Sequence, residues 1–549
     1  MEFTYSRTKI GQREKFFERL LEIVPALSSW GIIIGTAVLS LRKPILAAVI
    51  LIAFVLLWIM RLLYMNIFLV LSYMRLSIER STRWMVYIDK IDENSKEPDF
   101  TQGNSLSSRI SAFFHRSRME ELNKSPNPPP KSKQIYHLVI IPVIKEGREI
   151  VEPGLINIAK GDYPGQRILV VIALEESASG KVKSQMYELK EKYKGYFLDF
   201  FIILHPNGLD CESRVKGANA TYAARQAVSY FDARSIPYSN VIVSCFDADT
   251  VASPQYFSCL AYHFIVMPDR TRISYQPIPV YHNNIWDAPG FARIIDIGTS
   301  FFQLVEATNP SKLVTFSSHS MSLKALVEVG YWPRDMISDD SAIFWKSFIY
   351  YNGKYRTIPI YTTVSMDIAL GRSAKETFFN IYRQKRRWAW GIENFPIVIR
   401  AFVRAKAIPF YKKIIFSFKL IDSFVSWATW SFLLVLAGWF SVLFTSKEFS
   451  STTVYYIAPR IQTTIFSLAS LGLIVCMAIS ILLLPRKKNG SGLSKIAHAL
   501  EWSFIPFVIL VLSALPALDA QTRLMFGRYM EFRATDKYRK PKNHKEKTE

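Results

Sequence analysis

Three groups of carboxylates in this 549-residue chain each follow a short, continuous apolar run. The groups are Glu146, the pair Glu175 and Glu176, and the pair Asp247 and Asp249. Two carboxylates spaced i and i+2 just past a strand can share a divalent cation, and Mg²⁺ or Mn²⁺ accepts such oxygen ligands together with substrate phosphates. Asp247 and Asp249 are therefore the predicted metal ligands, and a solvated Asp turn is the alternative for the same residues.

Two further motifs follow later in the chain. Ser338-Asp339-Asp340 precedes a predicted amphipathic helix, where adjacent acids could also serve only as a helix N-cap. Gln384-Lys-Arg-Arg387-Trp388 combines an amide, guanidinium groups and a large aromatic ring. Such a set can bind a diphosphate bidentately and stack on the face of a sugar. A cytoplasmic basic cluster beside a membrane span is the alternative for this second motif.

The apolar runs themselves predict the elements that position these groups. Four runs are of the short, continuous kind that is typical of strands buried on both faces: 137–142, 167–174, 200–204 and 240–246. Helical stretches separate them, including the charged segment 184–196 and the Ala-rich segment 217–230. This β-α-β alternation predicts a mostly parallel sheet, in which ligands bind beyond the carboxyl ends of the strands.

Four apolar segments are long enough to cross roughly 30 Å of hydrocarbon as helices. They are residues 24–41, 45–70, 424–444 and 463–484. Basic residues crowd the N-terminus and follow the second segment, so the positive-inside rule places both the N-terminus and the middle of the chain in the cytoplasm. A fifth run, 502–518, contains Pro506 and Pro516 and leads into a basic tail. We expect this run to lie in the membrane interface instead of crossing the bilayer.

The composition limits the class of protein. Half of the residues are hydrophobic while 21% are charged, which excludes a uniformly disordered or fibrous chain. The four cysteines, Cys211, Cys245, Cys259 and Cys476, form no CxxC pair, so neither a disulfide framework nor a cysteine zinc site is supported. The formal net charge of +23 could reflect contact with anionic phosphates, but no nucleic-acid module is recognisable and much of the charge flanks the spans.

Taken in order, these motifs resemble those of family 2 inverting glycosyltransferases, in particular the membrane-embedded cellulose, chitin and hyaluronan synthase group. The matching motifs are Pro-x-x-x-Glu146, Glu175-Glu176, Lys216-Gly-Ala-Asn219, Asp247-x-Asp249, Ser338-Asp339-Asp340 and Gln384-x-x-Arg387-Trp388. The resemblance covers about 137–395. It implies an α/β GT-A (Rossmann-like) glycosyltransferase domain embedded between transmembrane helices, a nucleotide-sugar donor, and Mg²⁺ or Mn²⁺ as cofactor.

The resemblance also implies a role for each matching residue. Asp340 would be the catalytic base, and Gln384, Arg387 and Trp388 would serve the diphosphate and the acceptor sugar. The nucleotide-sugar would be bound by Glu146, Glu175, Glu176, Lys216 and Asp247, and the metal by Asp249 and Asp247. The tail sequence Phe532-Arg-Ala-Thr535-Asp-Lys537 is similar to the gating loop of cellulose synthases. The family has Thr-Glu-Asp where this chain has Ser-Asp-Asp, and other departures affect the identity of the donor more than the reaction type.

Together these features predict an integral, multi-pass protein of the cell membrane with a cytoplasmic catalytic domain and both termini cytoplasmic. The expected parts are 1–90 with the first helical hairpin, a polar linker at 91–134, the GT-A domain at 135–395, interfacial helices at 396–422, a transmembrane pair at 423–485, an interfacial region at 486–528 and a basic tail at 529–549. The chain ends soon after the gating-like segment, so a membrane partner or an oligomer is expected to complete any channel.

The expected activity is inverting transfer of a sugar, from a UDP-sugar for preference, to a growing polysaccharide. The enzymatic alternative is transfer of a single sugar to a membrane lipid, since lipid-modifying members carry a similar element around Arg387-Trp388. A basic protein that binds membrane surfaces or nucleic acid is the alternative from another class. An inactive homologue is disfavoured because every catalytic position bears a chemically competent group.

Overall fold

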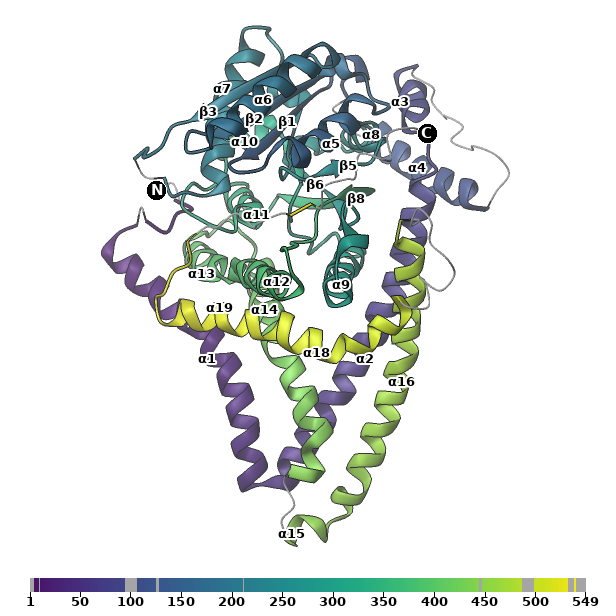
Figure 1. Cartoon of the computed structure of the whole chain (residues 1–549), viewed down its shortest axis with the longest axis vertical. Helices are drawn as coiled ribbons and strands as arrows, with labels where there is room; N and C mark the ends of the chain where they lie inside the picture. Colours follow the sequence, from purple (N-terminus) through teal and green to yellow (C-terminus); the bar gives the residue numbers. More distant parts are fainter. Residues whose placement is uncertain are drawn as a thin grey trace.

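The computed structural model describes residues 4–8, 10–93, 106–124, 128–210, 212–443, 447–485, 498–531 and 538–539. An α/β head stands on a stem of long helices, and a layer of shorter helices lies between the two (Figure 1). The four predicted apolar runs all form strands of the head, which confirms the α/β reading of the sequence.

The described head contains one eight-stranded sheet with the order β3-β2-β1-β4-β7-β6-β8-β5. The strands are β1 (Tyr136–Val143), β2 (Ile168–Glu175), β3 (Asp199–His205), β4 (Val241–Cys245), β5 (Val251–Ala252), β6 (Ile273–Val280), β7 (Ser320–Ser322) and β8 (Arg356–Ser365). Strands β3, β2, β1 and β4 are parallel, whereas β7 is antiparallel to both of its neighbours. The sheet is therefore mixed beyond β4, and the sequence predicted only its parallel half. This arrangement is the expected GT-A fold.

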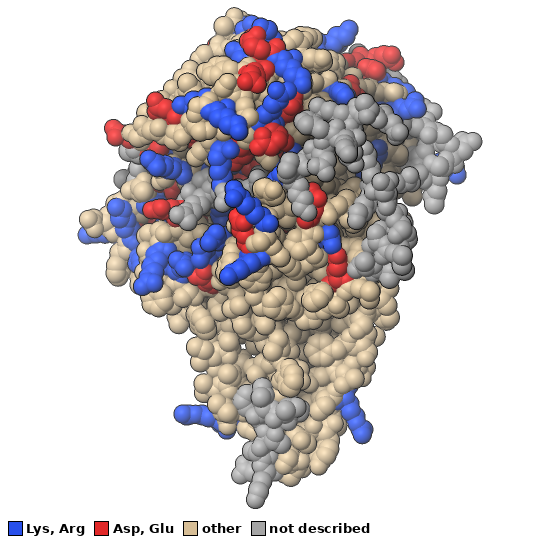
Figure 2. All heavy atoms as spheres, in the orientation of Figure 1, with Lys and Arg blue, Asp and Glu red and all other residues tan. Residues whose placement is uncertain are grey.

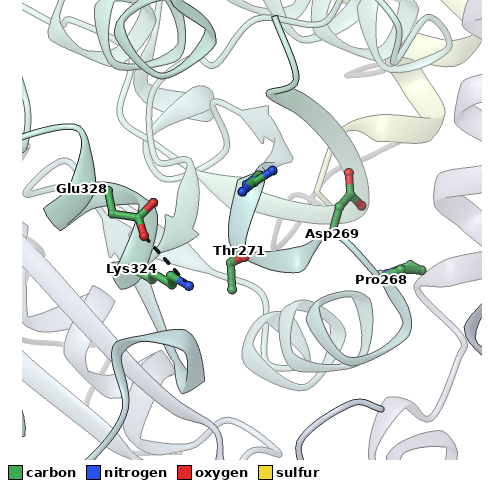
Figure 3. Close-up of a pocket in the computed structure, with 6 residues that line it drawn as sticks. Pro268, Asp269, Thr271, Lys324 and Glu328 are labelled. Atoms are coloured by element: carbon green, nitrogen blue, oxygen red, sulfur yellow. Dashed lines mark ion pairs between the residues drawn. The ribbon is translucent and has the colours of Figure 1, made fainter. Parts of the chain in front are cut away.

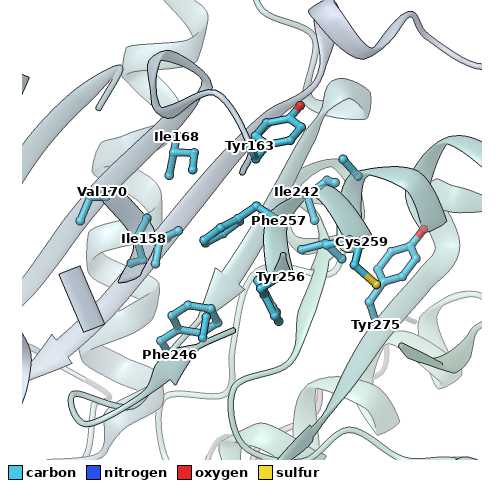
Figure 4. Close-up of a cluster of buried hydrophobic side chains, with 14 of the residues drawn as sticks. Ile158, Tyr163, Ile168, Val170, Ile242, Phe246, Tyr256, Phe257, Cys259 and Tyr275 are labelled. Atoms are coloured by element: carbon cyan, nitrogen blue, oxygen red, sulfur yellow. The ribbon is translucent and has the colours of Figure 1, made fainter. Parts of the chain in front are cut away.

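Helices cover both faces of the parallel half, because successive residues of each strand point to opposite sides. Leu138 and Ile140 pack with α7 (Lys216–Asp232), while Val139 and Ile141 belong to the cluster with α5 (Arg148–Ala159). Figure 4 shows part of this second cluster, where Phe257 and Tyr256 of α8 (Tyr256–Val266) meet side chains of the strands. Burying a large apolar side chain stabilises a fold by about 1.5–3 kcal/mol, which explains why 138–143 of β1, 168–174 of β2 and 200–204 of β3 are entirely apolar.

The other helices of the head are α3 (Trp84–Asp92), α4 (Leu106–Asn123), α6 (Gly180–Tyr193), α10 (Leu323–Glu328) and α11 (Asp339–Tyr350). Helix α4 lies within the segment that its composition predicted to be a linker. It packs on the head through an apolar stripe that includes Ala112, Met119 and Leu122, and His115 Nδ1 lies 2.7 Å from the hydroxyl of Tyr262. A stripe of so few apolar residues is too weak to distinguish from linker composition.

The stem consists of α1 (Gln12–Arg42), α2 (Pro44–Glu79), α14 (Phe410–Leu443) and α16 (Thr453–Leu483), with the short α15 (Lys447–Ser450) at its far end. Its outer surface carries no charge over most of its length (Figure 2), and apolar side chains such as Leu57, Met60 and Leu482 face outward. Such a surface suits lipid and not water. Each helix begins before its predicted span. The chain is a multi-pass membrane protein.

The layer between head and stem is built from α9 (Gly290–Ala307), α12 (Ala374–Ala389), α13 (Asn394–Arg404), α18 (Ile505–Ile509) and α19 (Leu515–Met525). The stretch from α18 to α19 runs across the stem helices (Figure 1), although His498–Met525 is long and apolar enough to cross a membrane by composition alone. A π-helical segment, Leu510–Ala514, interrupts it just before Pro516, which has no N–H to continue the α-helical ladder. The interfacial placement of 502–518 stays a prediction.

Candidate active site

Lys216 connects two of the predicted site carboxylates. Its ammonium Nζ lies 2.8 Å from Asp247 Oδ1, beyond the end of β4, and 3.1 Å from Asp340 Oδ1 in the first turn of α11. Lys216 is the first residue of α7. The next residue must be small, because a Cβ at Gly217 would lie only 2.5 Å from the carbonyl oxygen of Pro333. The glycine thus lets α7 approach the loop that carries Asp340.

The two adjacent acids of α11 have different environments. Asp339 is buried, and burial, reinforced by the nearby charge of Asp340, raises the pKa of Asp339 well above its ordinary value. Asp340 is partly exposed and is the one that contacts Lys216. Burial disfavours a charged ammonium, but the carboxylates of Asp247 and Asp340 outweigh it and raise the pKa of Lys216. Of the two acids, Asp340 has the accessible, charge-paired carboxylate.

Asp249 is bound by the backbone of the loop that follows β8. It is only 2% exposed, and its Oδ2 accepts a hydrogen bond of 2.8 Å from the backbone N–H of Asp367, just after β8. Asn283 Nδ2 donates to the carbonyl oxygen of Asp249 at 2.9 Å. Asp247, by contrast, accepts from the Ser317 hydroxyl at 2.5 Å and is more open to solvent.

The pair Asp247 and Asp249 suits a divalent cation that the donor helps to bind. No group of three or more His, Cys, Asp or Glu side chains in the described part of the chain could enclose a metal ion. Mg²⁺ usually binds through one or two carboxylates together with substrate phosphates, not in a cage made only of protein ligands. Two oxygen-donor side chains beyond a strand end therefore fit such an ion.

The segment Thr315–His319 joins the parts of the site, and no sequence motif pointed to it. The Thr315 hydroxyl donates to the carbonyl oxygen of Asp340 at 2.6 Å, and the Ser317 hydroxyl donates to Asp247. The ring of Phe316 meets that of Trp388 edge to face at 5.6 Å. Ser318 has a φ of +60°, which is unfavourable for a residue with a side chain and often marks functional loops. This strain is a property of the folded backbone, so the residue types alone gave no signal for the segment.

Gln384, Arg387 and Trp388, which were predicted to serve the diphosphate and the acceptor sugar, all lie on α12. The sequence did not identify their neighbour Lys385, whose Nζ lies 3.9 Å from the centre of the Trp388 ring. The same ammonium donates to Asp296 Oδ1 at 2.6 Å and to the Thr299 hydroxyl at 3.0 Å, both on α9. Lys385 and Asp296 are completely buried. Burial lowers the pKa of Lys385 and raises that of Asp296, so the two charges depend on each other.

The three glutamates predicted to face a nucleoside lie at strand ends but make separate contacts. Glu146 Oε2 accepts the N–H groups of Ile144 and Lys145, at 2.9 and 3.0 Å, and Glu176 accepts the N–H of Asn207 at 2.8 Å. Glu175 contacts His205 Nδ1 at 3.2 Å. These glutamates therefore lie at the strand ends, each held by its own contacts.

His205 was not predicted to belong to the site. Its Nε2 lies 3.0 Å from Glu212, whose other oxygen pairs with Arg334 at 2.7 Å. Burial alone would lower the pKa of His205, but the contacts with Glu175 and Glu212 raise it above its ordinary value. The result is a chain of charges from the end of β2 to the loop before Asp340.

The gating-like residues Phe532, Thr535 and Lys537 lie outside the described residues. Arg539, just beyond them, forms a bidentate pair with the carboxylate of Asp367 at 2.7 and 2.9 Å. Its Nη1 also donates to the carbonyl oxygen of Glu149 at 2.6 Å. Because the backbone of Asp367 supports Asp249, this part of the tail lies against the side of the predicted metal site.

A surface pocket of about 330 Å³ lies elsewhere on the head (Figure 3). It is lined by Pro268, Asp269, Thr271, Arg272, Lys324 and Glu328. None of the predicted site residues lines it. In Figure 3 its Lys324 and Glu328 pair with each other, at 3.9 Å, so their charges are not left for a ligand.

Comparison with known proteins agrees with the order of motifs. Residues 242–484 match the family described as glycosyl transferase family group 2. The chain is 23% identical over 306 residues to the poly-β-1,6-N-acetyl-D-glucosamine synthase of Staphylococcus aureus (strain COL), over 54% of this chain and 65% of the relative. The Staphylococcus epidermidis protein of the same name is 24% identical over 295 residues, which covers 52% and 60% of the two chains. The chain thus matches less than two thirds of the length of these relatives.

Two solved structures overlap with the chain more loosely. A mannosyltransferase from Pyrobaculum calidifontis in complex with GDP-Man and Mn²⁺ is 15% identical, with 73% of this chain and 99% of that chain covered and a TM-score of 0.34. Residues 1–349 of Staphylococcus aureus TarS in complex with UDP-GlcNAc are 12% identical, with 73% and 94% covered and a TM-score of 0.33. Because both TM-scores are this low, the fold is inferred from the strand order and the family match and not from these two structures.

Proposed function

From the premise that this chain belongs to glycosyltransferase family 2, we propose that it transfers sugars with inversion from a nucleotide-sugar to a growing polysaccharide. The observation that carries the proposal is the position of Lys216, whose ammonium contacts both Asp247 and Asp340. Lys216 therefore contacts both Asp247, which is predicted to bind the donor, and Asp340, which is predicted to be the catalytic base. Phe316 and Ser317 connect the same centre to Trp388 on the acceptor side.

In the proposed reaction, Asp340 takes the proton of an acceptor hydroxyl while that oxygen forms a bond to C1 of the donor sugar. The bond between C1 and the diphosphate oxygen breaks in the same step, and the nucleoside diphosphate leaves with the electron pair. Attack from the face opposite the leaving group inverts the configuration at C1. A general base in reach of the hydroxyl is typically worth about 10² to 10⁴-fold in rate.

Other residues of the chain would bind and orient the two substrates. Arg387 and Gln384 would hold the diphosphate, since a guanidinium matches two phosphate oxygens. Trp388 would stack on the acceptor sugar, and Glu146, Glu175 and Glu176 would face the nucleoside. A Mg²⁺ or Mn²⁺ ion held by Asp249 and Asp247 would neutralise charge on the leaving diphosphate. Phe532, Thr535 and Lys537 would cover the donor from the tail.

We also propose that the head faces the cytoplasm. The basic residues of Figure 2 are concentrated over the head, and few lie at the far end of the stem. Lys and Arg are retained on the cytoplasmic side of membrane proteins. This orientation would give the site access to nucleotide-sugars, while the product would meet the helical layer formed by α9, α12 and α19.

The test is an assay of the full chain in membranes with a panel of UDP- and GDP-sugars and Mn²⁺. UDP-N-acetylglucosamine is the first donor to try, because the similar staphylococcal proteins are named as synthases of a polymer of that sugar. Nucleotide release and the size of the labelled product are measured together. Membranes that carry the Asp340→Asn variant give the background for both.

Release of nucleotide with a long, labelled product is the expected result. A product of one sugar on a lipid would replace the polysaccharide proposal with single transfer. No transfer above background with any donor of the panel would refute a glycosyltransferase activity for this chain.

A further inference from the structure

A buried carboxylate five residues after Trp388 holds the loop that leads into Asp340 at the start of α11. Glu393 is 1% exposed and lies at the end of the short helical turn Trp390–Glu393. Its Oε1 accepts the backbone N–H groups of Ile337 and Ser338, at 3.1 and 3.0 Å, and the Ser338 hydroxyl at 2.7 Å. Ser338 precedes Asp340 by two residues. The orientation of the predicted base therefore depends on a carboxylate that none of the motifs contains.

The charge partner of Glu393 comes from the other end of the chain. Arg7 Nη1 donates to Glu393 Oε2 at 3.1 Å, and Trp390 Nε1 donates to the same oxygen at 2.9 Å. Residues 4–8, here called the N-terminal strap, lie along the loop before Asp340. Tyr5 donates to Asn394 Oδ1 at 2.6 Å, and Asn394 in turn donates to the Ser338 hydroxyl at 3.0 Å.

The strap also holds the beginning of the same loop. Asp335 Oδ2 accepts hydrogen bonds from the Ser6 hydroxyl at 2.6 Å, from the backbone N–H of Arg7 at 3.0 Å and from the Thr8 hydroxyl at 2.9 Å. The loop is thus fixed at Asp335 by the strap and at Ser338 by Glu393. Only Met336 and Ile337 lie between these two points.

Arg7 has a third neighbour in the C-terminal region. Its guanidinium lies 3.9 Å from the centre of the Tyr529 ring, and the Tyr529 hydroxyl donates to Glu22 of α1. Tyr529 stands three residues before the gating-like segment. Arg7 therefore contacts both Glu393, which holds the loop before the predicted catalytic base, and Tyr529, at the start of the C-terminal tail.

We propose that the N-terminal strap and Glu393 form a clamp that positions Asp340 for proton transfer, with Arg7 as its central residue. The inference rests on the proposed function, because it takes Asp340 as the base. Arg7 and Glu393 are positioning residues: they act on the reaction only through the loop from Asp335 to Ser338.

The physical reason is that proton transfer is sensitive to the position of the base. A displacement of about 1 Å in a reacting group can cost about 10²-fold in rate. Without Arg7, the buried Glu393 carboxylate would be left without its charge partner and would move toward solvent, and the loop bonded to it would move as well. The contacts of Glu146, Glu176 and Asp249 lie outside this loop, so nucleotide binding is expected to persist.

The test compares three variants of the full chain in membranes: Arg7→Ala, Arg7→Lys and Arg13→Ala. Arg13 is an exposed arginine six residues further on and serves as the matched control. For each variant, kcat for transfer, KM for the acceptor and nucleotide affinity in the absence of acceptor are measured. We expect Arg7→Ala to lower kcat by about 10- to 100-fold while nucleotide affinity changes by less than about twofold. Arg7→Lys keeps the charge and should restore much of kcat, and Arg13→Ala should match the unmodified protein.

Arg7→Ala could instead fail to fold, so a milder variant accompanies it. Ser6→Ala combined with Thr8→Ala removes two hydroxyl bonds to Asp335 and leaves no buried charge. It should lower kcat by about fivefold, the equivalent of about one hydrogen bond, at unchanged nucleotide affinity.

Unchanged kcat in both the Arg7→Ala protein and the double variant would overturn the clamp. A parallel loss of kcat and nucleotide affinity would do so too, because it would indicate a merely structural role. Failure of the proposed function is a different result: in that case the unmodified protein itself would transfer no sugar.

Discussion

The site contains two lysine–aspartate clusters, one around Lys216 and one around Lys385, that differ mainly in their burial. On the predicted donor side, the side chains of Lys216, Asp247 and Asp340 are 10%, 31% and 24% exposed. On the predicted acceptor side, those of Lys385 and Asp296 are 2% and 0% exposed. A partly exposed pair can exchange its partner for water or a substrate, whereas opening a buried pair leaves a charge in an apolar environment.

This difference in burial suggests different roles for the two clusters: the Lys216 cluster can take part in the reaction, and the Lys385 pair stabilises the fold. The donor-side carboxylates can take new partners, as a base and a cation site must. The pair of Lys385 and Asp296 lies next to Trp388, and the Lys385 ammonium contacts one face of the indole ring. It can fix the ring against α9 but has no access to a reacting atom. We therefore expect changes on the donor side to affect turnover and those in the buried pair to affect folding.

The largest effect is expected on the donor side. Asp340→Asn removes the base but keeps the size of the side chain, so kcat should fall by about 10² to 10⁴-fold. Nucleotide affinity should remain close to that of the unmodified protein, because the change leaves the strand ends intact. Turnover in isolated membranes and nucleotide binding are measured side by side, and equal turnover in the two proteins would rule out this residue as the base.

The buried pair should respond in stability. Lys385→Met leaves Asp296 as an unpaired buried charge and should lower the free energy of unfolding by about 3–5 kcal/mol. Adding Asp296→Leu removes that charge and should recover part of the loss. Lys324→Met is the control, because Lys324 pairs with Glu328 at the surface, where such a contact is worth about 0–1 kcal/mol. Equal stability of the two lysine variants would contradict the contrast between exposed and buried pairs.

A smaller effect is expected at the cation site. Asp249→Asn keeps the hydrogen bond from Asp367 but removes one charged oxygen ligand. Metal-dependent nucleotide affinity should therefore fall by at least the roughly 10-fold that the loss of a partner outside the ligand set costs. The measurement is nucleotide affinity with and without Mn²⁺. If Mn²⁺ improves binding equally in both proteins, Asp249 is not a metal ligand.

The smallest effect concerns pH. The pKa of His205 is raised in the folded protein by Glu175 and Glu212, so its contacts stabilise the fold fully below the ordinary histidine pKa of about 6.5. That stabilisation is lost as the pH rises through the raised value. His205→Gln should therefore lower the melting temperature by about 1–2 °C at pH 6 and by less at pH 9. A difference that is the same at both pH values would mean that the charge of His205 does not contribute.

Much of the donor side could be predicted from local patterns. The apolar runs that became β1 to β4 identified the strand ends, and their position directly after such a run marked Asp247 and Asp249 as candidate ligands. The mixed half of the sheet was missed. Strands β6 and β8 contain Pro, Ser and Thr and so are not continuous apolar runs, and β5 and β7 have only two and three residues. Runs this short have no detectable period. Helix α4 is 18 residues long but was missed for another reason, because its apolar stripe has too few residues to distinguish it from a polar linker.

The amino-acid sequence by itself determined the membrane spans, the parallel strands and the order of the motifs, because hydrophobic length and periodicity are local properties. The tertiary structure alone decided which distant residues meet. Arg7 and Glu393 are 386 positions apart, and Lys385 and Asp296 are 89 apart. Nothing in the spacing of such pairs reveals them, since each partner is selected by the packing of helices that come together only when the chain is folded.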